Sequence, residues 1–131
     1  MKLLLDTHIL LWSAVEPDRL SPRSRAALED PDNQLWVSPI SVWEALILAD
    51  RGRLQIDASD PGEWIRSVLA RMPLREAPLN VEVAVESRSV DLEHADPADR
   101  FLAATAIVYD LTLLTADRRL LRSRQLRTLA N

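Results

Sequence analysis

The sequence predicts a three-layer α/β/α sandwich, in which helices cover both faces of a mostly parallel central sheet of four to five strands. Short aliphatic runs, which are typical of strands buried on both faces, alternate along the chain with segments of helical pattern. The chain has 131 residues, of which 47% are hydrophobic and 27% are charged, as in an ordinary globular domain. We therefore expect a single domain over residues 1–131.

Four pairs of residues mark where helices begin, because each combines a capping side chain with a proline at the first helical position. These pairs are Ser21-Pro22, Ser38-Pro39, Asp60-Pro61 and Asp96-Pro97. In chain order, the pattern predicts helices over residues 8–15, 22–29, 40–51, 61–72, 81–90, 97–107 and 118–122. It predicts strands over residues 3–5, 34–37, 74–77, 111–115 and 125–129, with a further short extended segment at 54–56.

The composition excludes several classes of function. The chain has no cysteine, so it forms no disulfide, thiolate zinc site or cysteine nucleophile. Its two glycines, Gly52 and Gly62, are too few for a glycine-rich phosphate loop. No apolar run approaches the ~18 residues of a membrane span, and the first residues lack the pattern of a signal peptide. We expect a cytoplasmic protein with no membrane partner.

Two acidic residues directly follow buried strands. Asp6 comes after residues 3–5, and Asp117 comes shortly after residues 111–115. Parallel strands bring their carboxyl ends to one edge of a sheet, where ligands bind in open α/β folds, so these carboxylates are expected to meet there. Each also has a simpler interpretation as the cap of the helix that follows.

A third acid, Glu44, lies on an apolar helical stripe. Its neighbours four residues before and three and four residues after are aliphatic: Ile40, Ile47 and Leu48. An ionised carboxylate on a buried face needs a cation, which is either a metal or an arginine. The fourth acid, Asp99, is in the first turn of a helix, where the helix dipole alone favours it, and Asp96 is the expected cap.

Four converging carboxylates would repel one another and raise their pKa values unless a cation lay between them. Hard oxygen ligands without thiolates favour Mg²⁺ or Mn²⁺ over zinc. Such a site activates water and stabilises displacement at phosphorus. The sequence therefore predicts a metal site formed by Asp6, Glu44, Asp99 and Asp117.

The segments around these acids resemble PIN-domain proteins of the VapC toxin type, in order and over nearly the whole chain. The matching segments are Leu3-Leu4-Leu5-Asp6-Thr7-His8 with Leu11-Trp12, Ser41-Val42-Trp43-Glu44-Ala45, Asp96-Pro97-Ala98-Asp99-Arg100-Phe101-Leu102-Ala103-Ala104 and Leu113-Leu114-Thr115-Ala116-Asp117. Ala98 stands where a larger residue such as phenylalanine is frequent, which affects packing and leaves the chemistry intact.

The resemblance implies the toxin component of a type II toxin–antitoxin system, an endoribonuclease that depends on Mg²⁺ or Mn²⁺. By position, Asp6, Glu44, Asp99 and Asp117 would be its acidic tetrad. Thr115 would be an auxiliary hydroxyl, Thr7 would support the loop beside Asp6, and Asp96 would lie just outside the metal ligands. The resemblance also implies an RNA substrate, a homodimer and a small antitoxin that inserts into the catalytic groove.

Basic and aromatic residues are open to two interpretations. Arg100, Arg118 and Arg119 neighbour the acids and are candidates to contact substrate phosphates or antitoxin, although a basic C-terminal run is often only a solvated surface. His8 and His94 are expected to be structural or peripheral. Trp12 and Trp43 could stack on bases, but their apolar helical faces favour packing in the core or in a dimer.

Three other functions remain open. A PIN nuclease of RNA processing or DNA repair would use the same site without an antitoxin, and a binding module would hold a structural metal without catalysis. A phosphatase with Asp6 as its nucleophile fits less well, because it would need a second aspartate at the position of His8.

Overall fold

The computed structural model describes residues 1–52, 56, 59–92 and 96–131. Its strands are β1 (Lys2–Leu5), β2 (Gln34–Val37), β3 (Leu74–Glu76), β4 (Thr112–Thr115) and β5 (Thr128–Ala130). Its helices are α1 (Thr7–Val15), the short 3-10 helix η1 (Pro17–Arg19), α2 (Pro22–Glu29), α3 (Pro39–Asp50), α4 (Pro61–Ala70), α5 (Val81–Ser89), α6 (Pro97–Val108) and α7 (Arg118–Leu121). The five strands form one sheet in the order β3-β2-β1-β4-β5, and every pair is parallel. The predicted α/β/α class is confirmed.

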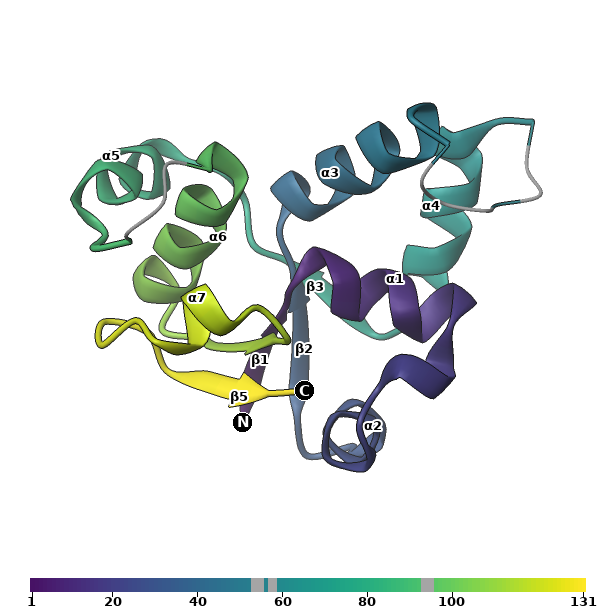
Figure 1. Ribbon diagram of the computed structural model, residues 1–131, viewed down its shortest axis with the longest axis horizontal. Helices are drawn as coiled ribbons and strands as arrows, with labels where there is room; N and C mark the ends of the chain where they lie inside the picture. The colour runs from purple at the N-terminus through teal and green to yellow at the C-terminus, as the bar shows by residue number, and fades with distance from the viewer. Residues whose placement is uncertain (53–55, 57–58, 93–95) are drawn as a thin grey trace.

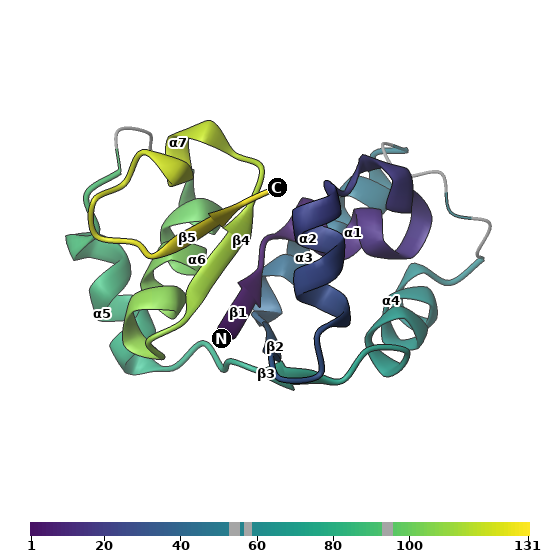
Figure 2. The same cartoon turned by 90° about the horizontal axis from the view of Figure 1, so that it is seen from below.

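The alternation of side chains along β1 divides the core into two parts. Leu3 and Leu5 face the side of the sheet that α1, α2, α3 and α4 cover, whereas Leu4 packs with Leu102 and Ala103 of α6 on the other side (Figures 1 and 2). All three leucines are fully buried, as expected for a strand in the middle of a parallel sheet. The apolar run at the start of the chain is therefore the centre of both halves of the core.

The four predicted helix starts are all observed. Ser21, Ser38, Asp60 and Asp96 each cap a helix with a side-chain oxygen, and a proline follows each of them. Such caps satisfy backbone N–H groups that have no partner inside the helix. Local chemistry therefore places α2, α3, α4 and α6 in the chain before any tertiary contact is considered.

The end of the chain differs from the prediction. The last strand was expected over residues 125–129, but β5 begins at Thr128. Leu126 is buried in the same core cluster as Leu4, although it lies outside the strand, so its apolar character reflects packing rather than strand pairing. Pro17 begins η1, a short helix that the sequence pattern does not predict. Most of the extended segment predicted at 54–56 lies outside the described residues, and residue 56 is not in a strand.

The order of the strands creates a crevice beside β1. The chain passes outward from β1 to β2 and β3 in one direction and adds β4 and β5 in the other. Helices that connect strands on opposite sides of such a switch point diverge, and the crevice opens at the carboxyl ends of the strands. Asp6 follows β1 at this point, and its N–H donates to the Leu114 carbonyl of β4 at 3.0 Å.

No helix within the described part of the chain has both the length and the apolar character required to cross a membrane.

Candidate metal and active site

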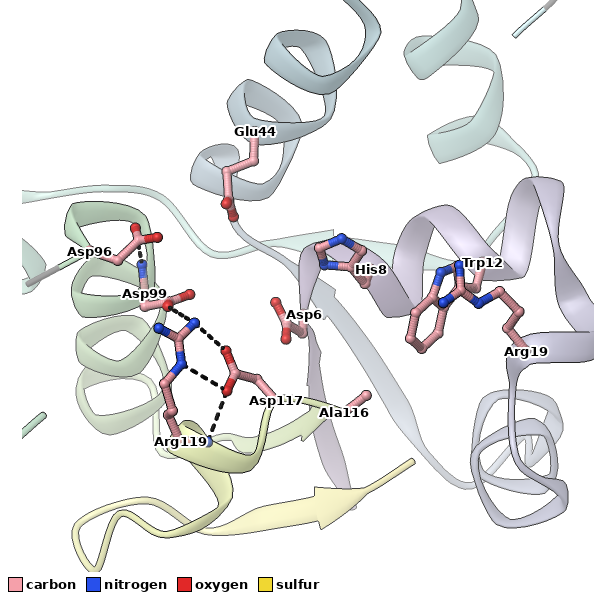
Figure 3. A pocket seen from close by; sticks show the side chains of 10 residues that line it. All are labelled: Asp6, His8, Trp12, Arg19, Glu44, Asp96, Asp99, Ala116, Asp117 and Arg119. Carbon is pink, nitrogen blue, oxygen red and sulfur yellow. Dashed lines mark hydrogen bonds and ion pairs between the residues drawn. The ribbon is translucent and has the colours of Figure 1, made fainter. Parts of the chain in front are cut away.

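A cavity of about 400 Å³ lies at this edge of the sheet. It is lined by side chains from α1 and the residue that caps it, from η1, α3 and the start of α6, and from residues 116–119 (Figure 3). The lining residues are Asp6, His8, Trp12, Arg19, Glu44, Asp96, Asp99, Ala116, Asp117 and Arg119. The four acids singled out in the sequence therefore lie around one cavity, although they are widely separated along the chain.

Asp6 is held firmly at the inner end of this cavity. It is 7% exposed, its Oδ1 accepts from the backbone N–H of Thr7 at 2.7 Å, and its Oδ2 accepts from the Thr115 hydroxyl at 2.5 Å. Burial raises the pKa of Asp6, and the nearby Asp99 carboxylate adds to this, while the two hydrogen bonds lower it. Asp6 thus caps α1 and faces the cavity at the same time.

Glu44 reaches toward Asp6 from the facing helix α3 (Figure 3). The Thr7 hydroxyl donates to Glu44 Oε1 at 2.6 Å, so Thr7 connects the two carboxylates through its N–H and its hydroxyl. Burial is also the main reason that the pKa of Glu44 is raised, followed in effect by the negative charges of Asp99 and Asp6. For both Asp6 and Glu44, burial is the largest cause of the raised pKa, and the neighbouring carboxylates raise it further.

The start of α6 contributes two acids with different contacts. Asp96 caps the helix, with its Oδ1 accepting from the N–H of Ala98 at 2.9 Å and of Asp99 at 3.4 Å. Asp99 follows in the first turn and is 8% exposed. Both line the cavity, so the capping role of Asp96 is compatible with a functional site at this position.

Arg119 lies between Asp117 and Asp99. Asp117 Oδ1 accepts from the N–H of Arg119 at 2.8 Å and so caps α7, while Arg119 Nη2 is 3.0 Å from Asp117 Oδ2 and 3.7 Å from Asp99 Oδ2 (Figure 3). The hydrogen bond and the charge of Asp117 raise the pKa of Arg119. Thr115 also joins this side, because its hydroxyl accepts from the Asp117 N–H at 3.0 Å while donating to Asp6. A cation of the chain itself is thus present among the acids.

The side chains of the four acids are of the type that binds a hard divalent cation, although they are not clustered tightly. Among the residues that the structure describes, no three acidic or histidine side chains are close enough together to hold a metal ion. The Arg119 guanidinium bridges two of the acids and partly balances their charge. Carboxylates without thiolates or paired imidazoles suit Mg²⁺ or Mn²⁺. Asp6, Glu44, Asp99 and Asp117 are therefore the residues that could hold such an ion, provided that Arg119 moves aside.

The other two candidate arginines lie away from these acids. Arg118 is exposed and is not among the residues that line the cavity. The Arg100 guanidinium donates from Nε to the Ser87 carbonyl at 2.9 Å and from Nη2 to the Val90 carbonyl at 2.9 Å. Arg100 thus connects α6 to the end of α5, which favours a structural role over contact with a phosphate.

Replacing Arg100 with alanine should lower the free energy of unfolding by about 1–3 kcal/mol, because it leaves partly buried carbonyl groups without donors. The exposed Arg88, on the neighbouring helix, is the control, and Arg88→Ala should change stability by no more than about 0.5 kcal/mol. Urea unfolding of both variants measures the difference. Equal stability of the two variants would contradict the structural role of Arg100.

Aromatic residues form the side of the cavity opposite α6. The rings of His8 and Trp12 are 5.8 Å apart between centroids, and the Arg19 guanidinium lies over the Trp12 ring at 4.5 Å from its centroid. No pattern in the sequence indicates Arg19. Packing is predicted for Trp12, and its ring does contact the core while also lining the cavity. Trp43 is 53% exposed, so core packing is wrong for it, and packing in a dimer stays a prediction. His94 lies outside the described residues.

An all-parallel sheet with carboxylates around a cavity at its switch point defines the class of α/β proteins that bind ligands at the carboxyl ends of their strands. A PIN domain family model matches residues 3–125, and the chain belongs to this family.

The chain is also similar to a known ribonuclease in sequence and to VapBC structures in fold. It is 35% identical to ribonuclease VapC22 of Mycobacterium tuberculosis over 120 residues, which are 89% of this chain and 88% of the relative. Its fold is similar to a chain of VapBC2 from Rickettsia felis bound to a promoter DNA fragment, with a TM-score of 0.73, 18% identity, and coverage of 100% of this chain and 99% of the other. DNA-bound VapBC from Salmonella typhimurium gives a TM-score of 0.71 at 18% identity, over 99% and 98% of the two chains.

Proposed function

We propose that this chain is the toxin component of a type II toxin–antitoxin system and that it hydrolyses phosphodiester bonds of single-stranded or loop RNA with Mg²⁺ or Mn²⁺. The observation that carries the proposal is the convergence of Asp6, Glu44, Asp99 and Asp117 on one cavity at the switch point of the sheet. The similarity to ribonuclease VapC22 supports RNA as the substrate.

The carboxylates would hold the ion, which when bound supplies positive charge beside the scissile phosphate and lowers the pKa of water. Asp6 is buried, and its two oxygens accept hydrogen bonds from Thr7 and Thr115. Thr7 and Thr115 act as positioning residues: Thr7 connects Asp6 to Glu44, and Thr115 connects Asp6 to the backbone of Asp117. Asp96 fixes the start of α6 and thereby the position of Asp99.

Arg119 would have two partners in turn. Its guanidinium pairs with Asp117 and Asp99, and if these acids held a cation it would be available to contact an oxygen of the substrate phosphate. Its side chain is 52% exposed, so it can move without disturbing the core. Arg119 is therefore the arginine that we assign to the substrate, ahead of Arg118 and Arg100.

We also propose an antitoxin partner and a homodimer for this chain. Solved relatives with the same fold are described as VapBC complexes, and an open acidic cavity with an arginine already in it can accept a basic side chain from a partner. A cytoplasmic location agrees with these partners. The alternative of a PIN nuclease without an antitoxin would use the same residues and differs only in substrate and genetic context.

The test is RNA cleavage by the purified chain, freed from any partner protein. We expect cleavage with Mg²⁺ or Mn²⁺, none with EDTA, and a loss of about 10³-fold in Asp99→Asn. Asp91→Asn is the matched control, because Asp91 is exposed and does not line this cavity. Cleavage that persists both in EDTA and in Asp99→Asn would refute the assignment. Metal binding without any cleavage would support a structural metal module instead.

A further inference from the structure

The cavity has two chemically different sides, and the acids account for only one of them. Asp96, Asp99 and Asp117 come from α6 and the start of α7, whereas the opposite side, contributed by α1 and η1, presents His8, Trp12 and Arg19 (Figure 3). This second side combines two aromatic rings with a positive charge. Binding of a divalent ion by the carboxylates does not require this second side of the cavity.

We propose that His8, Trp12 and Arg19 form a nucleotide-binding subsite, in which an unpaired RNA base stacks on the aromatic rings and Arg19 contacts a neighbouring phosphate. This inference rests on the proposed function and specifies how the substrate is bound beside the acids. Stacking on aromatic side chains together with arginine contact is how proteins commonly bind single-stranded nucleic acid.

The geometry of the rings suits this role. The planes of His8 and Trp12 are tilted by 53°, so the two rings do not cover each other's faces as a stacked pair would. His8 is exposed, and Trp12 is half-buried with its inner part against the core, which holds the ring in place. A fixed ring that lines an open cavity loses little freedom when a base stacks on it.

Arg19 is held near the cavity by weak contacts. Besides lying over Trp12, its guanidinium pairs with Glu16 at 3.6 Å, and both side chains of this pair are more than half exposed. Exposed pairs of this kind contribute little, so a phosphate can compete for the guanidinium.

The distance between Trp12 and the acids determines which nucleotide, counted from the cut, would occupy the subsite. Trp12 is on the helix that Asp6 caps, and six residues of helix rise by about 9 Å. Stacked nucleotides are about 3.4 Å apart along a strand, so the subsite lies within about three nucleotides of the cut. A rigid helix thus relates the base-binding surface to the position of cleavage.

The experiment measures cleavage rates and cut-site sequences on a random-sequence library of single-stranded RNA. Wild-type protein should prefer certain bases at one position within three nucleotides of the cut. Trp12→Leu should lower the rate about 10-fold and flatten the preference at that position, whereas Trp12→Phe should retain most of both. Val85→Ala is the control for a surface change, because Val85 is exposed on α5 and does not line the cavity.

Two further measurements separate stacking from a general loss of structure. An abasic ribose at the preferred position should slow the wild-type protein about 10-fold and leave Trp12→Leu unaffected. Arg19→Gln, a surface change, should reduce the salt dependence of RNA binding by about one phosphate contact. This variant keeps the proposal testable even if Trp12→Leu does not fold.

The outcomes distinguish the subsite from the proposed function. If Trp12→Leu and Arg19→Gln cleave with the wild-type rate and cut-site profile, the subsite is refuted and the nuclease assignment stands. If wild-type protein does not cleave RNA with either metal, both the subsite and the nuclease assignment are refuted. If the RNA profile is unchanged but the variants lose an otherwise stable complex with a small partner protein, the surface belongs to that partner and the subsite is refuted.

Discussion

Asp6→Asn should abolish RNA cleavage, by about 10³-fold or more, and yet stabilise the metal-free protein by about 1 kcal/mol at neutral pH. The loss of activity follows from removing the buried carboxylate whose two oxygens are fixed by Thr7 and Thr115. The gain in stability follows because burial and the Asp99 charge disfavour the ionised form of Asp6. Asparagine keeps an oxygen to cap α1 and carries no charge, while its NH₂ group replaces the oxygen that accepts from the Thr115 hydroxyl. Chemical unfolding in EDTA and a cleavage assay with Mg²⁺ measure the two effects.

The gain in stability should depend on pH. Because the pKa of Asp6 is raised above 3.8 in the folded state, the unfolded chain ionises first as the pH rises. The contribution of Asp6 to stability is then complete below pH 3.8 and is lost as the pH rises through the raised value. The advantage of Asp6→Asn should therefore be absent in acid, grow over this window and stay constant above it. An advantage that is equally large below pH 3.8 would show that the charge is not its cause.

Mg²⁺ should make the wild-type protein more stable than Asp6→Asn, which is the reverse of the order expected without metal. An ion that binds only the folded state stabilises it in proportion to the logarithm of its concentration over the dissociation constant. Wild-type protein should gain this stabilisation, whereas Asp6→Asn should gain little. A thermal melting series with increasing Mg²⁺ follows the change. Equal shifts in both proteins would mean that Asp6 is not a ligand.

Arg119→Gln should change metal binding and RNA cleavage in opposite directions. Without the guanidinium between Asp117 and Asp99, a divalent ion no longer competes with Arg119 for these acids, so we expect about fivefold tighter Mn²⁺ binding. Loss of a charged donor to the substrate phosphate should lower the cleavage rate about 100-fold. Titration calorimetry with Mn²⁺ and single-turnover cleavage measure the two quantities separately.

The matched control for Arg119 is its neighbour on the same helix. Arg118 is exposed and does not line the cavity, so Arg118→Gln should leave Mn²⁺ affinity within about twofold of the wild-type value. If the two variants bind Mn²⁺ equally, the ion pairs of Arg119 do not compete with the metal. If Arg119→Gln cleaves RNA at the wild-type rate, its contact with the substrate is refuted.

Features with a local cause could be predicted from the sequence. The capped helix starts depend on side chains two or three residues from the N–H groups that they bind, as at Asp96. The positions of Asp6 and Asp117 follow from parallel strands, whose carboxyl ends share an edge. Glu44 was found because a carboxylate interrupts an apolar helical stripe.

The contacts that organise the cavity have no local signal. Thr7 and Glu44 are 37 residues apart, and Thr115 and Asp6 are 109 apart, so these hydrogen bonds depend on how helices and strands pack. Arg119 was grouped with two other arginines by proximity in sequence, although only its side chain folds back onto the acids. Arg19 belongs to a 3-10 turn that the proline at position 17 did not reveal. Charge and spacing identify candidate residues, while packing decides which of them share a cavity.

The most direct test of the metal site is anomalous diffraction from crystals of the chain soaked in Mn²⁺, which detects the ion independently of any activity. We expect one or two Mn²⁺ peaks in the cavity, bound by oxygens of Asp6 and Asp99, with the Arg119 side chain withdrawn. The proposed metal site would be contradicted if saturating Mn²⁺ left no peak in the cavity and Arg119 still lay between Asp99 and Asp117.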